Sequence, residues 1–308
     1  MSRDPVESSD AANPSAIVVG GSAGLGWHVA RRLLTVGYNV TITGRTPEKL
    51  ETAAQSIRAA ISDSDTALNA SAFRVERVRG SQSRLSPQTN LRTSSGDATD
   101  RADASRWVKE HVEAFGGLDV LVSVVGRSDR GRVDTLAADK LNELLAVNVQ
   151  APLVCCQAAL PELRLRRGVI VHIGSLASRL TPRYMGGYIT AKHALAGMTR
   201  QLRLELQPDG VHVGLVCPGP IASSPSANET EVTPRYEIDD QNVPRAAAAP
   251  GGGAKLKGLT PETVAEAVWR CIRDREIEIV LPRKVRWLIA LNAVAPSWAD
   301  RILGSRTS

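Results

Sequence analysis

The chain alternates between short runs of apolar, often β-branched residues and longer stretches with the apolar spacing of helices. Continuous apolar strands that alternate with helices indicate a parallel sheet with helices on both faces. The pattern therefore predicts an α/β fold built on a single, doubly wound parallel sheet. The expected strands cover residues 16–19, 39–44, 91–95, 118–125, 168–174, 211–216 and 276–281, and the clearest helices cover 25–36, 139–166, 188–207 and 261–273.

Two polar segments interrupt this alternation. Residues 62–95 are rich in Ser, Arg, Asn and Gln, and we expect a surface insertion that ends in the strand at 91–95. Residues 224–258 include AAAAPGGG, and a loop of this length is usually a lid or disordered, so we expect a mobile substrate loop. The predicted division is a flexible tail over 1–13, one domain over 14–282 and an amphipathic C-terminal extension over 283–308.

The C-terminal extension combines cations with apolar residues. Its predicted apolar stripe consists of Val285, Leu288, Ile289, Leu291, Val294 and Trp298, and it follows Arg283, Lys284 and Arg286. One interpretation is a helix that packs on its own domain or on a partner subunit. The other is an interfacial helix that makes peripheral contact with an anionic membrane through residues 283–303.

Composition and charge exclude several classes of protein. The hydrophobic content of 43% and charged content of 23% are ordinary for a soluble protein. The net charge of +6 is spread over solvated arginines without a zinc-finger, basic-zipper or RNA-binding signature, so we expect no nucleic-acid partner. The polar N-terminus lacks the pattern of a signal peptide, and no apolar run approaches a spanning helix. The four cysteines lack metal-site spacing, which favours buried, reduced thiols in a cytoplasmic protein and no metal.

A glycine-rich turn follows the first predicted strand. It reads Gly20-Gly21-Ser22-Ala23-Gly24-Leu25-Gly26 and leads directly into a helix. Glycines at 20, 24 and 26 allow the backbone to approach a pyrophosphate, and the N–H groups of the helix point at that anion. The G-x-x-x-G-x-G spacing differs from the common G-x-G-x-x-G fingerprint, and a plain turn is the alternative. Its place after the first strand favours a dinucleotide site.

The end of the second strand indicates which dinucleotide. An NAD site usually has a carboxylate here for the ribose hydroxyls, whereas this chain has Gly44 followed by Arg45. A guanidinium suits a 2′-phosphate, so we predict NADP(H) rather than NAD(H). The alternative is a solvated surface arginine.

A tyrosine and a lysine stand four residues apart at Tyr188 and Lys192, so on a helix they share one face. A free phenol titrates near about 10. A neighbouring ammonium favours the phenolate and makes the group a better acid–base catalyst at neutral pH. Ser175 follows a predicted strand, where its hydroxyl opens onto the ligand crevice of an α/β sheet or caps a helix. Tyr184 has no lysine at the matching offset, and we interpret it as a wall or substrate contact.

The glycine turn, Ser175 and the Tyr188/Lys192 pair, in this order and spacing, resemble the classical short-chain dehydrogenase/reductase family over roughly residues 14–282. The resemblance implies a Rossmann-type fold and hydride transfer between nicotinamide and a carbonyl or alcohol. It implies that Ser175 orients the carbonyl oxygen, that Tyr188 transfers the proton, and that Lys192 holds the ribose and lowers the tyrosine pKa. Asn148 matches the helix asparagine whose backbone carbonyl holds a water linked to the lysine.

The resemblance also implies a set of cofactor contacts. Asp97, followed by Ala98, matches the aspartate at the adenine amino group, and the segment from Pro218 to Ile221, with Ser223, matches the one at the nicotinamide amide. Two departures are visible: Val19 replaces the usual threonine, and Ser123-Val124-Val125-Gly126 replaces N-N-A-G. The expected cofactor residues are Gly20, Ser22, Gly24, Leu25, Gly26, Arg45, Asp97, Ala98, Gly126, Tyr188, Lys192, Pro218, Gly219, Ile221 and Ser223.

The resulting hypothesis is an NADP(H)-dependent oxidoreductase for a small-molecule carbonyl or alcohol, assembled as a homodimer or homotetramer. It would be cytoplasmic or peripheral at a membrane. A 3-oxoacyl-[acyl-carrier-protein] reductase-like enzyme and a non-catalytic NADP-binding sensor or scaffold are the alternatives. The substrate pocket should involve 127–133, 176–184 and 224–258, whose residues do not indicate which substrate is bound.

Overall fold

A single seven-stranded sheet forms the centre of the molecule. The computed structural model describes residues 13–68, 90–222, 243 and 257–306. The strand order is β3-β2-β1-β4-β5-β6-β7, and every neighbouring pair is parallel. The predicted α/β fold is confirmed. The strands are β1 (Ser15–Val19), β2 (Asn39–Gly44), β3 (Leu91–Ser95), β4 (Val120–Ser123), β5 (Val169–Ile173), β6 (His212–Pro218) and β7 (Glu278–Leu281).

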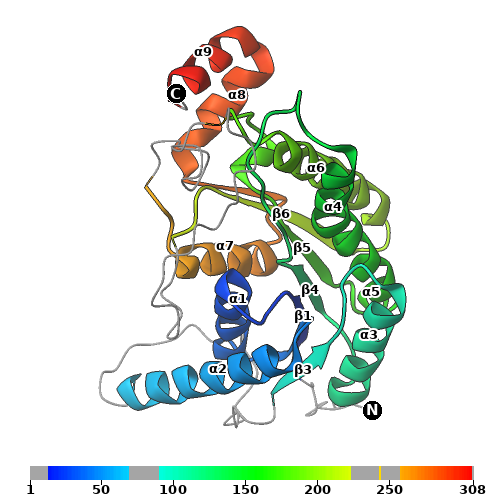
Figure 1. The fold of residues 1–308 in the computed structure, drawn as a ribbon. Helices are drawn as coiled ribbons and strands as arrows, with labels where there is room; N and C mark the ends of the chain where they lie inside the picture. The colour runs from blue at the N-terminus through cyan, green and yellow to red at the C-terminus, as the bar shows by residue number, and fades with distance from the viewer. Residues whose placement is uncertain (1–12, 69–89, 223–242, 244–256, 307–308) are drawn as a thin grey trace, which may run out of the picture.

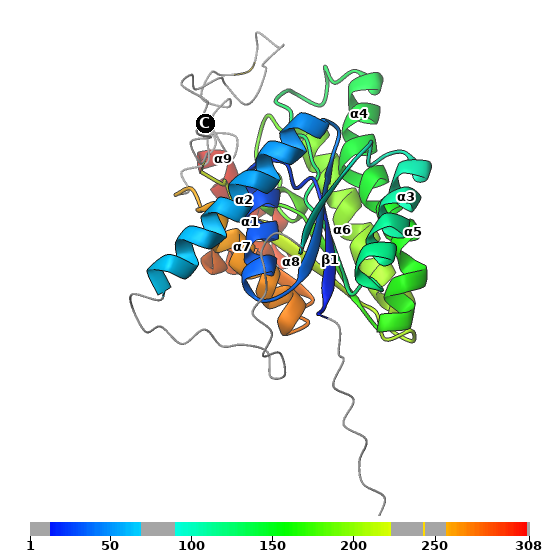
Figure 2. The ribbon, with the colours of Figure 1, turned by 90° about the horizontal axis from the view of Figure 1, so that it is seen from below.

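Helices cover both faces of this sheet because its strands are apolar on both faces. In β1, Ala16 and Val18 join one buried cluster, whereas Ile17 and Val19 join the other. Figures 1 and 2 show α1, α2 and α7 on one side of the sheet and α3, α5 and α6 on the opposite side. These helices are α1 (Gly24–Thr35), α2 (Pro47–Leu68), α3 (Arg101–Phe115), α5 (Ala151–Arg166), α6 (Gly186–Leu206) and α7 (Pro261–Arg273).

The predicted helix over 139–166 contains a π-helical turn that the apolar spacing does not reveal. Helix α4 (Ala138–Leu145) leads into this turn, η1 (Ala146–Gln150), which continues into α5. The stretch Ala138–Arg166 is long and apolar enough to cross a membrane by length and composition. It contacts α3 and α6, as expected of a core helix. Single π-turns inside α-helices occur frequently at functional sites.

The predicted insertion over 62–95 begins too early, and the strand expected at its end is present. Residues 62–68 continue α2, whose preceding turns bury Ala54, Ile57 and Ile61 at helical spacing. At the other end β3 pairs with β2, with Leu91 opposite Val40. The remaining residues, 69–89, lie outside the described part of the chain, as do the N-terminal tail up to residue 12 and most of the predicted loop at 224–258.

The C-terminal extension forms two short helices that pack on the domain. Helices α8 (Arg286–Val294) and α9 (Pro296–Arg306) are joined at Ala295, whose φ of −144° and ψ of 68° are not helical. Leu288 and Ala299 are buried in a cluster that includes Leu176 and Leu180. Val285, Leu288, Ile289 and Leu291 of the predicted stripe lie in or against this cluster. Val294 and Trp298, which are 82% and 64% exposed, do not belong to it.

All four cysteines are buried and free, as predicted, at positions 155, 156, 217 and 271. Burial raises the pKa of each thiol to about 12. These groups are therefore protonated near neutral pH, and the thiolate form needed for nucleophilic chemistry is scarce.

Candidate active site

The expected functional residues gather along one edge of the sheet. Because all strands are parallel, their carboxyl ends share this edge, and ligands bind there in open α/β sheets. The order of the strands in the sheet determines the order in which the candidate site residues lie along this edge. Following the sheet from β3 to β6, the edge carries Asp97, Arg45, the glycine turn at 20–26, Gly126, Ser175 and Pro218.

The glycine turn lies close against neighbouring backbone. The N–H groups of Gly20 and Gly21 both donate to the Thr43 carbonyl at 3.0 Å. A Cβ at Gly26 would lie 2.0 Å from the Gly20 carbonyl oxygen, so only glycine fits there. A Cβ at Gly24, whose φ is +52°, would meet nothing within 4 Å. The turn thus leaves open space beside the first N–H groups of α1, where a pyrophosphate would fit.

Arg45 and Asp97 lie at the ends of adjacent strands. The Asp97 carboxylate accepts hydrogen bonds from the Thr99 N–H at 2.8 Å and the Thr99 hydroxyl at 2.7 Å. These bonds lower the pKa of Asp97, and the nearby Arg45 charge lowers it further. The Ser22 hydroxyl lies 3.3 Å from the Cβ position of Gly44, which brings the glycine turn next to Arg45.

Lys192 is buried next to Tyr188, as the four-residue spacing of the two residues predicts. Both residues lie on α6, and the lysine Nζ is 5.7 Å from the centroid of the Tyr188 ring. Nζ donates to the Ile173 carbonyl at 2.9 Å. Burial lowers the pKa of Lys192 to about 8. The group therefore remains largely protonated at pH 7 and places a positive charge beside the phenol.

Asn148, at the centre of the π-turn, faces the same lysine. Its Nδ2 donates to the carbonyls of Arg127 at 2.8 Å and Leu144 at 2.9 Å. Its Oδ1 is buried and accepts no hydrogen bond within the described structure. A Cβ at Gly126 would lie 3.0 Å from this oxygen and 3.2 Å from the Lys192 Nζ. Both polar atoms therefore converge on Gly126, near the start of the loop after β4.

Ser175 follows β5 and caps the short 3₁₀ turn η2 (Leu176–Ser178). Its hydroxyl oxygen accepts the Ala177 N–H at 3.1 Å, and its own N–H donates to the Ser178 hydroxyl at 3.1 Å. The predicted cap is thus present. Because the hydroxyl acts as an acceptor in this capping bond, its proton is free of that bond and can donate to a ligand.

Asp129 is a site residue that sequence reasoning missed. Its Oδ1 accepts the backbone N–H of Tyr188 at 2.9 Å, and a Cβ at Gly187 would lie 2.6 Å from its Oδ2. The loop after β4 thereby holds the first turn of α6. The two residues are 59 positions apart and belong to no joint motif, so no sequence signal indicates their contact.

Apolar packing replaces the asparagines expected after β4. The Val125 Cγ1 lies 3.0 Å from the Cβ position of Gly20, so this side chain packs directly against the glycine turn. Leu25 and Ala98, both expected near the cofactor, are partly buried and pack against the clusters on opposite faces of the sheet. The segment after β4 is thus positioned by packing as well as by the hydrogen bonds of Asn148.

The last expected cofactor segment follows β6. The Gly219 N–H donates to the Leu281 carbonyl at 2.7 Å, and Ile221 forms a parallel bridge with Leu259. Pro218 is buried at the end of β6. Ser223 lies outside the described residues, so its predicted contact is not tested.

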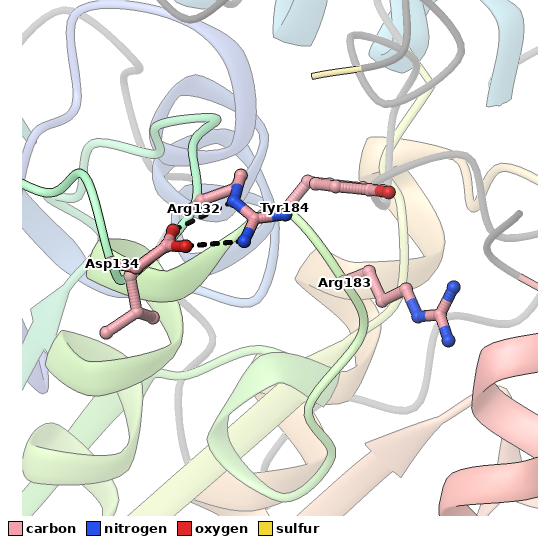
Figure 3. Close-up of a pocket in the computed structure, with 5 residues that line it drawn as sticks. Arg132, Asp134, Arg183 and Tyr184 are labelled. Atoms are coloured by element: carbon pink, nitrogen blue, oxygen red, sulfur yellow. Dashed lines mark hydrogen bonds and ion pairs between the residues drawn. The ribbon is translucent and has the colours of Figure 1, made fainter. Parts of the chain in front are cut away.

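A pocket of about 480 Å³ opens beside the start of α6 (Figure 3). The Gly131 N–H donates to the Tyr184 carbonyl at 3.0 Å and joins its two loops. Two of the segments expected to line the substrate pocket, 127–133 and 176–184, contribute to it. Tyr184 has a φ of +63°, which is uncommon outside glycine and asparagine. The lining residues are Arg132, Val133, Asp134, Arg183 and Tyr184.

Comparison with known proteins identifies the family. The model of the short chain dehydrogenase family matches residues 14–72 and 66–233. The 2-(R)-hydroxypropyl-CoM dehydrogenase of Xanthobacter autotrophicus is 31% identical over 67% of this chain and 74% of its own length. A short-chain dehydrogenase from Streptomyces avermitilis shares the fold with a TM-score of 0.69 and 21% identity, over 96% of this chain and 99% of its own.

An actinorhodin polyketide ketoreductase variant, solved with NADPH, aligns with a TM-score of 0.65 and 23% identity, over 87% of this chain and 95% of its own. The glycine turn, the strand-end serine and the Tyr188/Lys192 pair thus occur in a fold shared with known dehydrogenases. The chain belongs to the short-chain dehydrogenase family of oxidoreductases, which act on alcohol and ketone groups with a nicotinamide cofactor.

Proposed function

We propose that the protein is an NADP(H)-dependent oxidoreductase for a small-molecule carbonyl or alcohol, with Tyr188 as the general acid and base. The observation that carries this proposal is the buried Lys192 ammonium, 5.7 Å from the centroid of the Tyr188 ring. Burying a cation costs free energy because the charge loses its hydration. A buried ammonium next to a phenol stabilises the phenolate that forms when the tyrosine gives up its proton. A non-catalytic sensor could use Lys192 to hold the cofactor ribose, but it would not need the phenol beside it.

The chain's own residues provide the proton chemistry. When bound, NADPH supplies the hydride that reduces the carbonyl carbon. The Tyr188 hydroxyl donates its proton to the carbonyl oxygen, and the Ser175 hydroxyl donates a hydrogen bond to the same oxygen as negative charge develops. The Lys192 ammonium stabilises the phenolate that remains on Tyr188. In the oxidative direction the phenolate accepts the proton instead.

The sheet edge fits a dinucleotide lying from β3 to β6. The glycine turn and the start of α1 would hold the pyrophosphate, Asp97 with Ala98 the adenine, and Gly126 the adenine-side ribose. Lys192 would bind the nicotinamide ribose, and the segment from Pro218 to Ile221 the nicotinamide amide. Gly24, whose Cβ position has no atom within 4 Å, leaves room for a phosphate, and Gly26 lets the helix lie against the Gly20 carbonyl.

Arg45 supports NADP(H) over NAD(H), because no carboxylate follows β2 and a guanidinium suits the 2′-phosphate. We expect NADPH to bind at least about tenfold more tightly than NADH. Arg45→Ala should remove most of this difference, whereas Lys109→Ala, an exposed cation on α3, should leave it unchanged. Dissociation constants from fluorescence titration give the measurement. Equal affinities of the unmodified protein for the two cofactors would contradict the assignment.

The reaction itself is tested with a panel of aldehydes, ketones and alcohols, with NADPH consumption or NADP⁺ reduction as the readout. We expect turnover of at least one class, and a preference for the phosphorylated cofactor. Tight NADPH binding with no turnover across a broad panel would favour the non-catalytic sensor. Turnover confined to acyl-carrier-protein thioesters would favour the reductase of that class.

We further propose a cytoplasmic homodimer or homotetramer. Peripheral membrane contact is a separate proposal that rests on Trp287 and Trp298, which are 54% and 64% exposed on α8 and α9, close in sequence to cations at 283, 284 and 286. Light scattering of the purified protein measures the assembly. A monomer at micromolar concentration would contradict the first proposal.

A further inference from the structure

The pocket beside α6 is lined by residues that lead into the first turn of this helix, which carries the proposed acid–base residue. Tyr184 lines it and precedes Tyr188 by four residues in the chain. The loop after β4, which supplies the opposite wall, accepts the Tyr188 N–H at Asp129 and bonds to Tyr184 through Gly131. A molecule whose carbonyl reaches Tyr188 would therefore extend its remaining groups toward this pocket.

The two guanidiniums of the pocket are not equivalent. Arg132 forms a two-point ion pair with Asp134, with Nε 2.8 Å from Oδ1, so its charge is compensated (Figure 3). Arg183 makes no hydrogen bond or ion pair with any residue that the structure describes. Its Nη2 lies 3.4 Å from the Cβ position of Gly304 on α9, so the guanidinium lies beside the last turn of that helix.

The pocket therefore carries one uncompensated positive charge. Its lining contains two arginines and one aspartate, and Figure 3 shows the Arg183 and Tyr184 side chains extending to the same side, away from the Arg132–Asp134 pair. A guanidinium binds carboxylates through two parallel N–H donors, and the phenol of Tyr184 can add a third donor. A neutral substrate would leave these donors to water.

We propose that Arg183 binds an anionic group of the substrate, most simply a carboxylate, while the carbonyl of the same molecule lies at Tyr188. This inference rests on the proposed oxidoreductase function and adds the substrate class: small oxo acids or hydroxy acids. Arg183 is then a specificity-determining residue, with Tyr184 beside it as a second donor. The Arg132–Asp134 pair forms a wall of the pocket without net charge.

The test compares acids with their neutral counterparts. The probes are the 2-, 3-, 4- and 5-oxohexanoates and their methyl esters, which vary the distance between carbonyl and carboxylate. We expect at least one acid to have a kcat/KM at least about tenfold above that of its ester, the range of one charge-assisted bidentate contact. Arg183→Gln should bring this ratio to within about twofold by raising the KM of the acid, with the ester unaffected.

Two controls separate binding from stability. Arg200→Gln removes an exposed arginine on α6 about three turns beyond Tyr188 and should keep the acid preference. Arg183→Lys keeps the charge but lacks the planar pair of donors, so it should retain part of the preference for the acid over the ester. If Arg183 serves only the C-terminal end of α9, Arg183→Gln will lower the melting temperature and leave the acid-to-ester ratio unchanged, which would overturn the proposal.

Failure of this inference is distinguishable from failure of the proposed function. Esters that react as well as their acids, or a preference that survives Arg183→Gln, would overturn the anion site and leave the oxidoreductase intact. If no probe or other carbonyl reacts, calorimetric titration of the acids and esters into the NADPH complex still measures whether the acids bind more tightly than the esters. Tighter binding of the acids that depends on Arg183 supports the site, and equal binding overturns it.

Discussion

Lys192 holds its charge in the interior of the protein, and this has a consequence for stability. Burial lowers its folded-state pKa to about 8, below the 10.5 of the free group. Between these values Lys192 is more protonated in the unfolded chain than in the folded one, so its own contribution to folding stability increases as pH rises, whereas the four buried thiols contribute in the opposite direction. We therefore expect the free energy of unfolding of the unmodified protein, relative to that of Lys192→Met, to increase with pH across this window. Urea unfolding of both proteins without cofactor, between pH 7.5 and 10.5, checks it, and parallel pH curves would contradict it.

Gly26 shows a steric requirement of the cofactor turn. A Cβ at this position would lie 2.0 Å from a backbone oxygen, so Gly26→Ala must displace the turn or the helix. We expect lower stability and the loss of measurable NADPH binding. Gly197, in the middle of α6, has open space around its Cβ position, so Gly197→Ala should stabilise the protein by about 0.5–1 kcal/mol. Calorimetric melting and cofactor titration would show both effects; normal NADPH binding by Gly26→Ala would disprove the first.

Helix α6 carries Tyr188 in its first turn, and Asp129 fixes that turn from outside the helix. We expect Asp129→Ala to lower stability by about 1 kcal/mol, as the loss of a helix cap does, and to lower kcat more than it raises KM. Asp129→Asn keeps an acceptor oxygen and should restore most of kcat. Asp100, which caps α3, provides the control: Asp100→Ala should cost similar stability and leave kcat at saturating NADPH unchanged. Equal kcat losses in both alanine variants would indicate a general loss of stability instead.

The elements were predictable wherever their own residues determine them. The central strands β1, β4 and β5 follow from apolar runs that are buried on both faces, and the pairing of Tyr188 with Lys192 follows from helical spacing. The π-turn around Asn148 could not be predicted, because one additional residue per turn hardly changes the apolar pattern. The contact of Asp129 with α6 depends on how two distant loops meet, which the spacing of residues along the chain does not encode.

At the scale of the whole molecule, the C-terminal helices cover part of the active-site side of the domain. Leu288 and Ala299 pack with Leu176 and Leu180, in the segment that follows Ser175. We expect truncation after Pro282 to lower the melting temperature and kcat together, because it exposes this cluster. Leu288→Ala should cost about 2–5 kcal/mol of stability on its own. A truncated protein with unchanged melting temperature and kcat would contradict this role.

The outward side of the same helices is a separate question, which liposome flotation addresses. If Trp287 and Trp298 contact a membrane, the protein should float with anionic vesicles and not with neutral ones. Replacing both tryptophans with serine should abolish flotation and leave the melting temperature unchanged. Flotation that survives this double replacement, or its absence in the unmodified protein, would remove the membrane proposal.

The location of the candidate site could be predicted at this scale, because doubly wound sheets bind their ligands at the carboxyl ends of their strands. The charge of the pocket beside α6 could not be predicted from the sequence. Arg132, Asp134 and Arg183 belong to loops without periodic pattern, and only the folded structure shows that Asp134 compensates Arg132 and leaves Arg183 without an ion-pair partner among the described residues.

The most direct test of the catalytic assignment is the turnover of Tyr188→Phe. This substitution keeps the ring above Lys192 and removes only the hydroxyl, so the melting temperature and NADPH affinity should be preserved. On a substrate that the unmodified enzyme reduces, we expect kcat to fall by about 10²–10⁴-fold, the usual contribution of a positioned general acid. A near-normal kcat in this folded, cofactor-binding variant would contradict the account, and Tyr184 would then be the phenol to test.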